Sequence, residues 1–350
     1  MSRNKENRFL ILLSIIVSFF IGIRFLDVGK DTEQYLIQFN KYSSIESVFN
    51  GYEIGFSLLM HLFSKYTSSV EFFFFFVSLL ITSIYLLFFK RIYLRNFIEE
   101  SFNFDRMIFF FSLLLLSSWY LTMTTNGLRQ GIALVFLYYG LFDLFYNNRK
   151  FKFIIFYLIS ISFHYSVLIV GPFLLLKYVR FRLVFAVWIL TAVGYIYGVN
   201  ELIIKLISAK FNLPVYDFIK LYSLDRGVID GGLYNGFSLK FFIYTVFWPL
   251  LLMFIFKIKL RVKSSSLLAK ETLNLIKIYL ILSMPYFIFG FGPFSNRYAM
   301  LAWFLVPVLQ FHILNTISIK NNFKIFLVIF SIITFLFFLF FRLQWIRVLV

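Results

Sequence analysis

The feature that most constrains this chain is a set of long stretches that contain no charged side chain. Four stretches of 17 to 19 residues hold no Asp, Glu, Lys or Arg, namely residues 72–89, 107–125, 183–199 and 298–315. About 20 apolar residues let a helix cross a bilayer, and lipid admits only helices or closed barrels because every backbone polar group must be paired. The stretches lack the apolar–polar alternation of barrel strands. The sequence therefore predicts an all-α, polytopic helical membrane protein.

The composition supports this class and excludes several others. Hydrophobic residues make up 61% of the chain and charged residues 14%, against about 25% charged residues in soluble domains. Because the chain has no cysteine, disulfides and thiolate metal sites are excluded. A net charge of +18 would suggest nucleic acid in a soluble protein. In a membrane protein it follows from basic cytoplasmic loops, so we expect a lipid bilayer and no nucleic acid as partner.

The basic residues predict the topology, since short cytoplasmic loops are rich in Lys and Arg. We expect one integral membrane domain over residues 1–350, with about ten transmembrane helices and a broken-helix hairpin around His164. The spans are placed at 9–26, 70–89, 107–125, 128–146, 183–199, 238–256, 273–291, 298–315 and 323–341, and the hairpin at 153–176. Residues 27–69 form an outer loop with an interfacial helix at 54–64, and residues 200–236 form a large outer loop.

The hairpin prediction depends on the basic residues that follow it. A single span over 153–176 would place Lys177, Arg180 and Arg182 outside, whereas two half-helices keep them in the cytoplasm. Each half of about 12 residues reaches only about 18 Å, so the turn at His164 must lie below the outer surface. Broken helices are tolerated where protein or a water-filled cavity covers the freed backbone.

Unusual polar residues gather on the predicted outer face. They come from the first outer loop, the start of the fourth helix, the hairpin turn and a late connection, and they are Asp31, Glu33, Tyr35, Glu53, Asn126, Arg129, Gln130, His164, Tyr165, Ser166, Asn296, Arg297 and Tyr298. Simpler interpretations stay open. Arg129 and Arg297 could have no role beyond extending their charged ends to the lipid headgroups. His164 could be a structural residue, and the acids could be solvated loop charges.

These residue types suit the transfer of a sugar from a lipid diphosphate. Arginine binds phosphate with two parallel hydrogen bonds and stays charged, so two arginines can hold a diphosphate and stabilise it as it leaves. A neutral imidazole can remove a proton from an attacking hydroxyl. The chain contains no Gly-x-Ser-x-Gly, no His-Glu-x-x-His and no P-loop, which argues against peptide hydrolysis and nucleotide-driven work.

The motifs that carry these residues resemble the EpsG family, which is related to the Wzy-type O-antigen polymerases. The most specific part is Asn-x-x-Arg-Gln-x-x-Ala at 126–133, followed about 30 residues later by Phe-His-x-Ser at 163–166. The resemblance also covers Asp31 to Tyr35, Glu53 and the late Asn-Arg-Tyr at 296–298, and so most of the chain.

The resemblance implies a glycosyltransferase that polymerises O-antigen or exopolysaccharide at the outer face of a bacterial plasma membrane. Its substrate would be an undecaprenyl-diphosphate-linked oligosaccharide, and a flippase and a chain-length regulator would be candidate partners. No cofactor is implied. No metal is required either, although Asp31-x-Glu33 keeps metal dependence open. The alternatives are a lipid-linked oligosaccharide flippase or transporter, a membrane acyltransferase that modifies polysaccharide, and a membrane scaffold.

The resemblance also implies a role for each site residue. Arg129 and Arg297 would bind the donor diphosphate, and His164 would be the base or a further diphosphate contact. Asp31 or Glu53 would bind sugar hydroxyls or replace His164 as the base. The tyrosines could stack on sugar rings, and the other polar residues would contact substrate; this group comprises Glu33, Tyr35, Asn126, Gln130, Tyr165, Ser166, Asn296 and Tyr298.

Overall fold

A computed structural model describes most of the chain as helices. The described residues are 3–24, 31–42, 46–49, 52–96, 104–214, 216–217, 219, 237–260, 266–292, 295–317 and 321–342. They form two compact units, one of residues 1–167 with 317–350 and one of residues 168–316, and each is described here by itself. Within the described residues the secondary structure is helical, with no strand, so the predicted all-α class is confirmed.

Among the described residues, six helices are long and apolar enough to cross a membrane. They cover Val70–Arg95, Leu128–Tyr146, Leu239–Ile258, Lys270–Phe289, Ser295–Thr316 and Asn321–Phe340. Two bent helix pairs raise the number of candidate spans in the described part of the chain to at most eight. The predicted class of helical membrane protein is therefore confirmed, whereas the predicted count of about ten spans is not.

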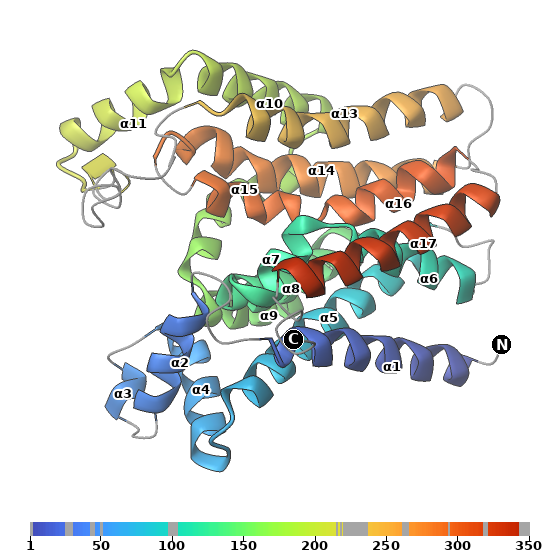
Figure 1. The fold of residues 1–350 in the computed structure, drawn as a ribbon. Coiled ribbons are helices and arrows are strands. Elements are labelled where there is room, and N and C mark those ends of the chain that lie inside the picture. The colour runs from blue at the N-terminus through green and yellow to red at the C-terminus, as the bar shows by residue number, and fades with distance from the viewer. Residues whose placement is uncertain are drawn as a thin grey trace. The chain divides into compact units, whose positions relative to one another are not determined.

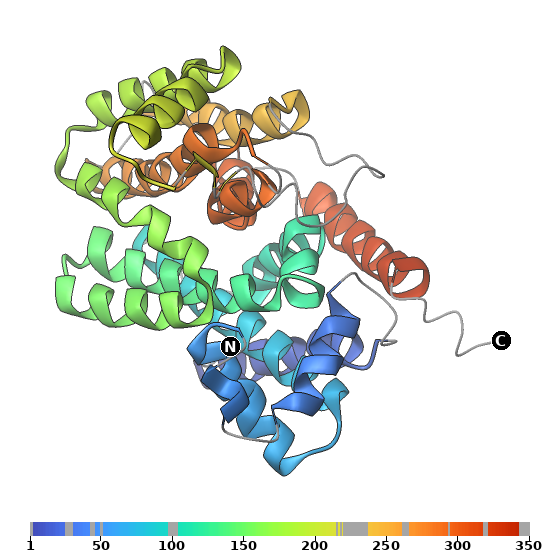
Figure 2. The same cartoon turned by 90° about the vertical axis from the view of Figure 1, so that its left-hand side faces the viewer.

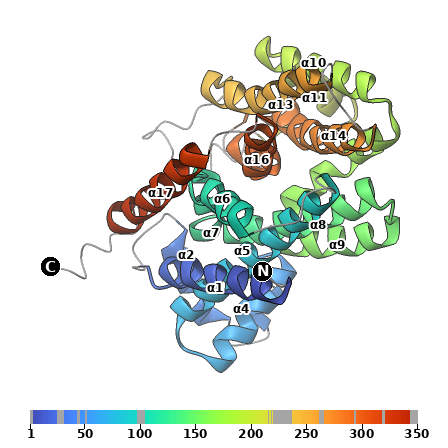
Figure 3. The same ribbon diagram turned by 90° about the vertical axis from the view of Figure 1, so that its right-hand side faces the viewer.

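The first unit is a bundle of short and long helices (Figure 1). Its elements are α1 (Arg3–Gly22), α2 (Thr32–Lys41), α3 (Glu46–Phe49), α4 (Ile54–Tyr66), α5 (Val70–Asn96), α6 (Phe104–Leu115), α7 (Ser118–Thr125), α8 (Leu128–Tyr146), α9 (Lys150–Phe163) and α17 (Asn321–Phe337), which ends in a π-helical turn, η3 (Phe338–Arg342). Helix α1 packs along α5, and α8 packs along both α5 and α9. Figure 2 shows α8 and α9 side by side, and Figure 3 shows α17 beside α6.

Small residues let α1 approach α5 closely. Ser14, Ser18 and Gly22 recur every four residues along α1, and all three are buried. A Cβ atom at Gly22 would lie 2.6 Å from the Cα of Phe75 in α5. Because apolar side chains gain little by leaving lipid for a helix interface, close backbone packing through small residues is what holds such helices together.

We therefore expect Gly22→Ala to destabilise the first unit. The added methyl group would force α1 away from α5, and overpacking of this kind typically costs about 1–3 kcal/mol. The measurement is the midpoint of thermal unfolding in detergent. Ile16→Ala, on the exposed side of α1, is the control and should have the smaller effect. A Gly22→Ala protein with the same unfolding midpoint as the wild type would contradict the close contact between α1 and α5.

The predicted span 107–125 is wrong as one continuous helix, because the structure breaks it. Helices α6 and α7 meet at an angle of 72°. The break lies at Ser117, whose side chain accepts a hydrogen bond from the N–H of Tyr120. A serine in this position satisfies a backbone donor that a new helix would leave unpaired, so it starts α7 separately.

The helix break predicted at His164 is confirmed. Helix α8 has the predicted bounds, and α9 ends at Phe163, followed by His164 in an extended conformation (φ −161°, ψ 120°). The chain continues as two 3₁₀ helices, η1 (Tyr165–Val170) and η2 (Pro172–Tyr178), rather than as the expected α-helical half. The chain passes from the first unit to the second after residue 167, so the return direction of the hairpin stays a prediction.

The second unit consists of η2 and six further described helices. These are α10 (Phe181–Ile196), α11 (Val199–Lys210), α13 (Leu239–Leu260), α14 (Ser266–Phe289), α15 (Ser295–Trp303) and α16 (Val306–Thr316). Helix α14 is central, since it packs against α10, α13 and α15. We expected residues 200–236 to form a large outer loop, but the start of this segment is helical. Helix α11 occupies their start, and residues 220–236 lie outside the described part.

A proline inside α13 shows how the second unit pairs backbone groups within its core. Pro249 has no N–H, so the carbonyl of Thr245 four residues earlier loses its helical partner. The hydroxyl of Tyr279 in α14 donates to that carbonyl at 3.0 Å, and the indole N–H of Trp303 donates to the Thr245 hydroxyl at 2.8 Å. These bonds tie α13 to α14 and α15 where water could not replace the lost bond.

Candidate functional site

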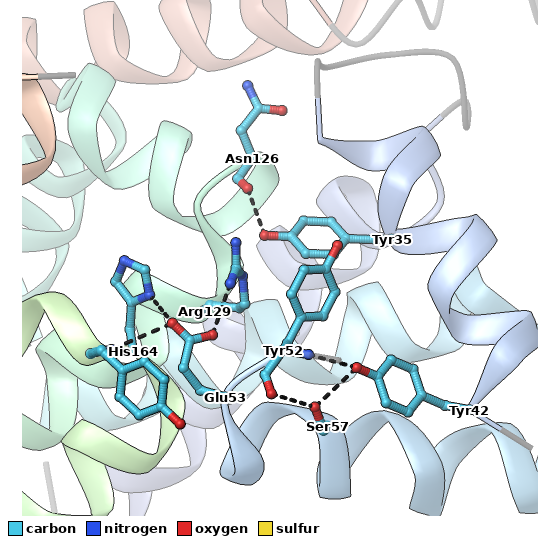
Figure 4. Close-up of polar contacts among 9 residues, drawn as sticks. Tyr35, Tyr42, Tyr52, Glu53, Ser57, Asn126, Arg129 and His164 are labelled. Atoms are coloured by element: carbon cyan, nitrogen blue, oxygen red, sulfur yellow. Dashed lines mark hydrogen bonds and ion pairs between the residues drawn. The ribbon is translucent and has the colours of Figure 1, made fainter. Parts of the chain in front are cut away.

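Glu53 lies at the centre of the polar cluster in the first unit (Figure 4). It precedes α4 and is buried, with 5% of its surface exposed. Its Oε1 lies 2.6 Å from Nδ1 of His164 and accepts a longer hydrogen bond from the Tyr165 N–H at 3.4 Å. Its Oε2 accepts from Nη1 of Arg129 at 2.8 Å. Because an ionised carboxylate can only accept, the contact assigns the Nδ1 proton to the imidazole.

The three side chains meet because α4, α8 and α9 converge. Arg129 is the second residue of α8, and His164 directly follows α9. The hydroxyl of Ser160 in α9 donates to the carbonyl of Ala133 in α8 at 2.5 Å. At Gly55 in α4 a Cβ atom would lie 2.5 Å from the Ser162 hydroxyl of α9, so only a glycine allows this approach. Motifs far apart in the sequence are thereby joined into one site.

An aromatic and hydroxyl network lies beside the ion pair. The guanidinium of Arg129 lies 4.2 Å from the ring centre of Tyr52, an arrangement that favours a cation. The Tyr52 N–H donates to the hydroxyl of Tyr42 at 2.8 Å, and the Ser57 hydroxyl donates to the Tyr52 carbonyl at 3.0 Å. The network fixes the backbone that immediately precedes Glu53 (Figure 4).

The surroundings of Glu53 keep it ionised. Burial raises the pKa of its carboxyl group, but the hydrogen bond and charge of His164 and the charge of Arg129 outweigh burial and lower the pKa to about 2. A carboxylate with so low a pKa is a weak base. Glu53 therefore suits the orientation of its two partners better than it suits proton removal from a substrate.

The lowered pKa of Glu53 predicts an acid-sensitive contribution to stability. The contribution is full above pH 4.5, the ordinary carboxyl pKa, and is lost as pH falls through the folded-state pKa of about 2. At 1.36 kcal/mol per pKa unit it amounts to about 3 kcal/mol. The difference in unfolding midpoint between wild type and Glu53→Gln should therefore shrink below pH 4.5.

The control for this measurement is Glu33→Gln, because Glu33 is exposed. It should follow the wild type at every pH. A gap between wild type and Glu53→Gln that stays constant down to pH 3 would contradict the pairing of Glu53.

The turn between α7 and α8, which immediately precedes the helix that carries Arg129, is held by two residues of the N-terminal segment. Arg24 donates through Nη2 to the carbonyl of Thr125 at 2.8 Å and through Nη1 to that of Ile21 at 3.0 Å. The Tyr35 hydroxyl donates to the next carbonyl, that of Asn126, at 3.0 Å. The ends of helices leave carbonyls unpaired, and these two side chains satisfy consecutive ones.

Arg24 is not among the site residues predicted from the sequence, although one signal was present. It is a lone arginine at the end of the first apolar run, which is usually a residue that reaches toward headgroups. In the structure it is 1% exposed and stacks 4.2 Å from the ring centre of Phe74. Tyr35 is also buried, among aromatic rings, and burial raises its pKa to about 12, so its hydroxyl keeps the proton that it donates.

We expect Arg24→Met to lower the midpoint of thermal unfolding. The substitution leaves the Thr125 carbonyl without its donor, and a buried unpaired carbonyl costs about 1–3 kcal/mol. Arg8→Met is the control, because Arg8 is exposed on α1, the helix that ends two residues before Arg24. Equal midpoints for the two variants would show that Arg24 does not hold the turn.

Four other predicted site residues also belong to the first unit. Gln130 is buried in α8, and Asp31 immediately precedes α2. Glu33 is exposed on the first turn of α2, and Tyr165 is exposed next to His164. Within the described residues, no group of three or more His, Asp or Glu side chains could hold a metal ion.

The remaining predicted residues belong to the second unit. Asn296, Arg297 and Tyr298 lie on the first turn of α15 and are partly exposed. The ring of Tyr298 lies 6.1 Å from that of Phe289, centre to centre. The first unit thus brings together the motifs at 126–130 and 163–166 with Glu53, and the motif at 296–298 is placed on its own unit.

Three buried polar atoms of the first-unit site have no hydrogen-bond partner in the described structure. They are Oδ1 of Asn126, Nε of Arg129 and Oγ of Ser166. Buried polar atoms are nearly always paired, and leaving one unpaired is costly. These three atoms belong to the two motifs that meet at Glu53, and they mark positions where a polar ligand or water would bind.

The fold and the site together define a helical membrane protein with a buried carboxylate that joins an arginine to a histidine. The chain belongs to the EpsG family, whose family model matches residues 7–347, nearly the whole length. This is a Wzy-like polymerase family, so the resemblance read from the motifs is confirmed. The protein is accordingly a membrane protein of polysaccharide-polymerase type. Neither a curated protein nor a solved structure matches it.

Proposed function

We propose that the protein is a glycosyltransferase that joins saccharide repeat units carried on a lipid diphosphate. The observation that supports this function best is the Glu53 carboxylate, which contacts Nδ1 of His164 at 2.6 Å and Nη1 of Arg129 at 2.8 Å. A base and a phosphate-binding cation are thereby held next to each other, as transfer from a diphosphate leaving group requires. Membership of the EpsG family supports the same chemistry.

His164 is the general base in this proposal. With Glu53 accepting the Nδ1 proton, the lone pair of the neutral ring is on Nε2. A carboxylate that orients a histidine in this way also stabilises the imidazolium once a proton arrives. Nε2 takes the proton of an acceptor sugar hydroxyl, whose oxygen bonds to the anomeric carbon of the donor. The bond from that carbon to the diphosphate oxygen breaks, and the lipid diphosphate leaves with the electron pair.

Arg129 stabilises the leaving diphosphate. Its Nη1 is bound by Glu53, but its buried Nε has no partner and can donate to a phosphate oxygen. The charges support this role, because Glu53 and Arg129 carry opposite charges and His164 acts as the base from its neutral form. When His164 takes the proton, the cluster gains one positive charge as negative charge develops on the diphosphate, which is electrostatic stabilisation of the transition state.

The remaining assignments are carried over from the family motifs. Arg297 is the second arginine for the diphosphate, and Asp31 and Glu33 bind sugar hydroxyls together with Asn126, whose buried Oδ1 lacks a donor. The substrate is an undecaprenyl-diphosphate-linked oligosaccharide, delivered by a flippase to the outer face of the bacterial plasma membrane. Tyr35 serves the site by holding the turn before Arg129, since it is 2% exposed.

The test is polymerisation by the purified protein in nanodiscs, supplied with the cognate undecaprenyl-diphosphate-linked repeat unit and followed on a gel. Wild type should give a ladder, and His164→Gln and Arg129→Ala should lower its rate by about 10²–10⁴-fold, the range for loss of a general base or of an oxyanion-stabilising donor. Addition of a chelator tests whether the reaction needs a metal ion.

Arg149→Ala is the matched control, because Arg149 also faces a buried carboxylate, that of Asp143 at 3.9 Å, outside this site. It should keep the ladder. Transport of a labelled lipid-linked sugar without joining would favour a flippase. A ladder that persists in both site variants would overturn the roles of His164 and Arg129.

A further inference from the structure

Helix α11 of the second unit has its apolar side chains on the outside. Leu202 is 55% exposed and Leu206 59% exposed, and three neighbouring positions are exposed to a similar extent, namely Val199, Ile203 and Ile207. Their spacing of three and four residues places them on one face of the helix. Five large aliphatic side chains in one exposed stripe form a surface that soluble proteins seldom leave in water.

The opposite face of α11 is polar and points inward. Ser208 is buried, and its hydroxyl accepts from the N–H of Tyr216 at 3.2 Å. Oε1 of Glu201 accepts from the Tyr216 hydroxyl at 3.2 Å. The side chain of Asn200 donates to the carbonyls of Thr191 and Phe287, each at 2.8 Å. The helix is therefore the reverse of a surface helix in water, which would turn its aliphatic face inward.

The angle between α10 and α11 says where this face points. The two helices meet at 89° around Gly198, whose φ of 70° permits the turn. Helix α10 has 16 residues and is about 24 Å long, somewhat less than the hydrocarbon thickness of about 30 Å. If α10 crosses the membrane, α11 runs along its plane and just inside its surface. Tyr197 at the corner is 77% exposed, as aromatic residues at membrane interfaces commonly are.

We propose that α11 lies in the lipid–water interface of the membrane, with its aliphatic stripe in the outer part of the acyl chains of the phospholipid bilayer. Interfacial helices bury their apolar face by about 5–10 Å, which matches the short length of α10. Lys205 on the flank and Lys210 at the C-terminal end can extend their ammonium groups to the headgroups. This placement concerns lipid contact alone and does not depend on the proposed polymerase activity.

The placement also sets the depth of the second arginine motif within its unit. Tyr216, which α11 binds, stacks on Phe291 with 6.0 Å between ring centres. Ile219 packs so closely on Gly292 that a Cβ atom there would lie 2.5 Å from its Cγ2. Both contacts fall on the connection between α14 and α15, within the three residues that follow α14. An interfacial α11 therefore holds the start of α15, which carries Arg297, near the membrane surface.

The absence of native cysteine makes a labelling experiment direct. Leu206→Cys and Lys205→Cys are each labelled with an environment-sensitive fluorophore and placed in nanodiscs of phosphatidylethanolamine and phosphatidylglycerol, which expose both faces of the membrane. We expect the label at position 206 to emit at shorter wavelength and to be quenched by doxyl-labelled lipid. The label at 205, on the polar flank, should instead be quenched by aqueous iodide.

A label at position 206 that iodide quenches as strongly as at 205, with no quenching by doxyl lipid, would overturn the proposal, because α11 would then lie in water. A label at 206 that neither agent quenches would overturn it as well, since protein would then cover the stripe. Leu202→Cys repeats the test one turn away. Unfolding midpoints equal to that of the wild type would show that the labelled proteins are folded.

Discussion

The Glu53 carboxylate is the interaction on which the site depends, because it carries a charge into a buried position and two cationic or potentially cationic groups converge on it. A buried charge is tolerated only when it is paired and hydrogen-bonded, so Glu53 requires Arg129 and His164 where they are. The same requirement fixes the neighbouring backbone. Helix α4 must approach α9 at Gly55, and the turn before α8 must be held by Arg24 and Tyr35.

The apolar surroundings of the helices impose this pairing elsewhere in the chain. In the second unit Tyr279 supplies the donor that Pro249 lacks, and Trp188 donates to the Ser283 hydroxyl to join α10 to α14. In the first unit α1 and α5 come together through Ser14, Ser18 and Gly22 rather than through bulky side chains. Hydrogen bonds between helices and close packing of small residues therefore do the work that the hydrophobic effect does in soluble proteins.

The division of roles within the site follows from charge. Glu53 remains ionised because its partners hold its pKa low, so it orients the histidine and is a poor base itself. In the proposed reaction Arg129 stays paired with Glu53 while His164 takes the proton. The positive charge of the cluster then grows as negative charge develops on the diphosphate. The buried polar atoms of Asn126, Arg129 and Ser166 that have no partner in the described structure belong to the two motifs that meet at Glu53.

The sequence by itself determined the membrane class, the bounds of α8, the break at His164 and the motifs that belong to the EpsG family. These features are local, because a run of about 20 apolar residues is enough to define a span and a polar residue within such a run is conspicuous. Only the tertiary structure decided the breaks within 107–125 and after residue 196, and the burial of Arg24. It also decided the pairing of Glu53 with Arg129 and His164, which lie 76 and 111 positions further along the chain. In lipid, helices are apolar on every side, so their sequences carry no periodic signal for which faces meet. The helix faces that pack decide which distant polar groups come within bonding distance.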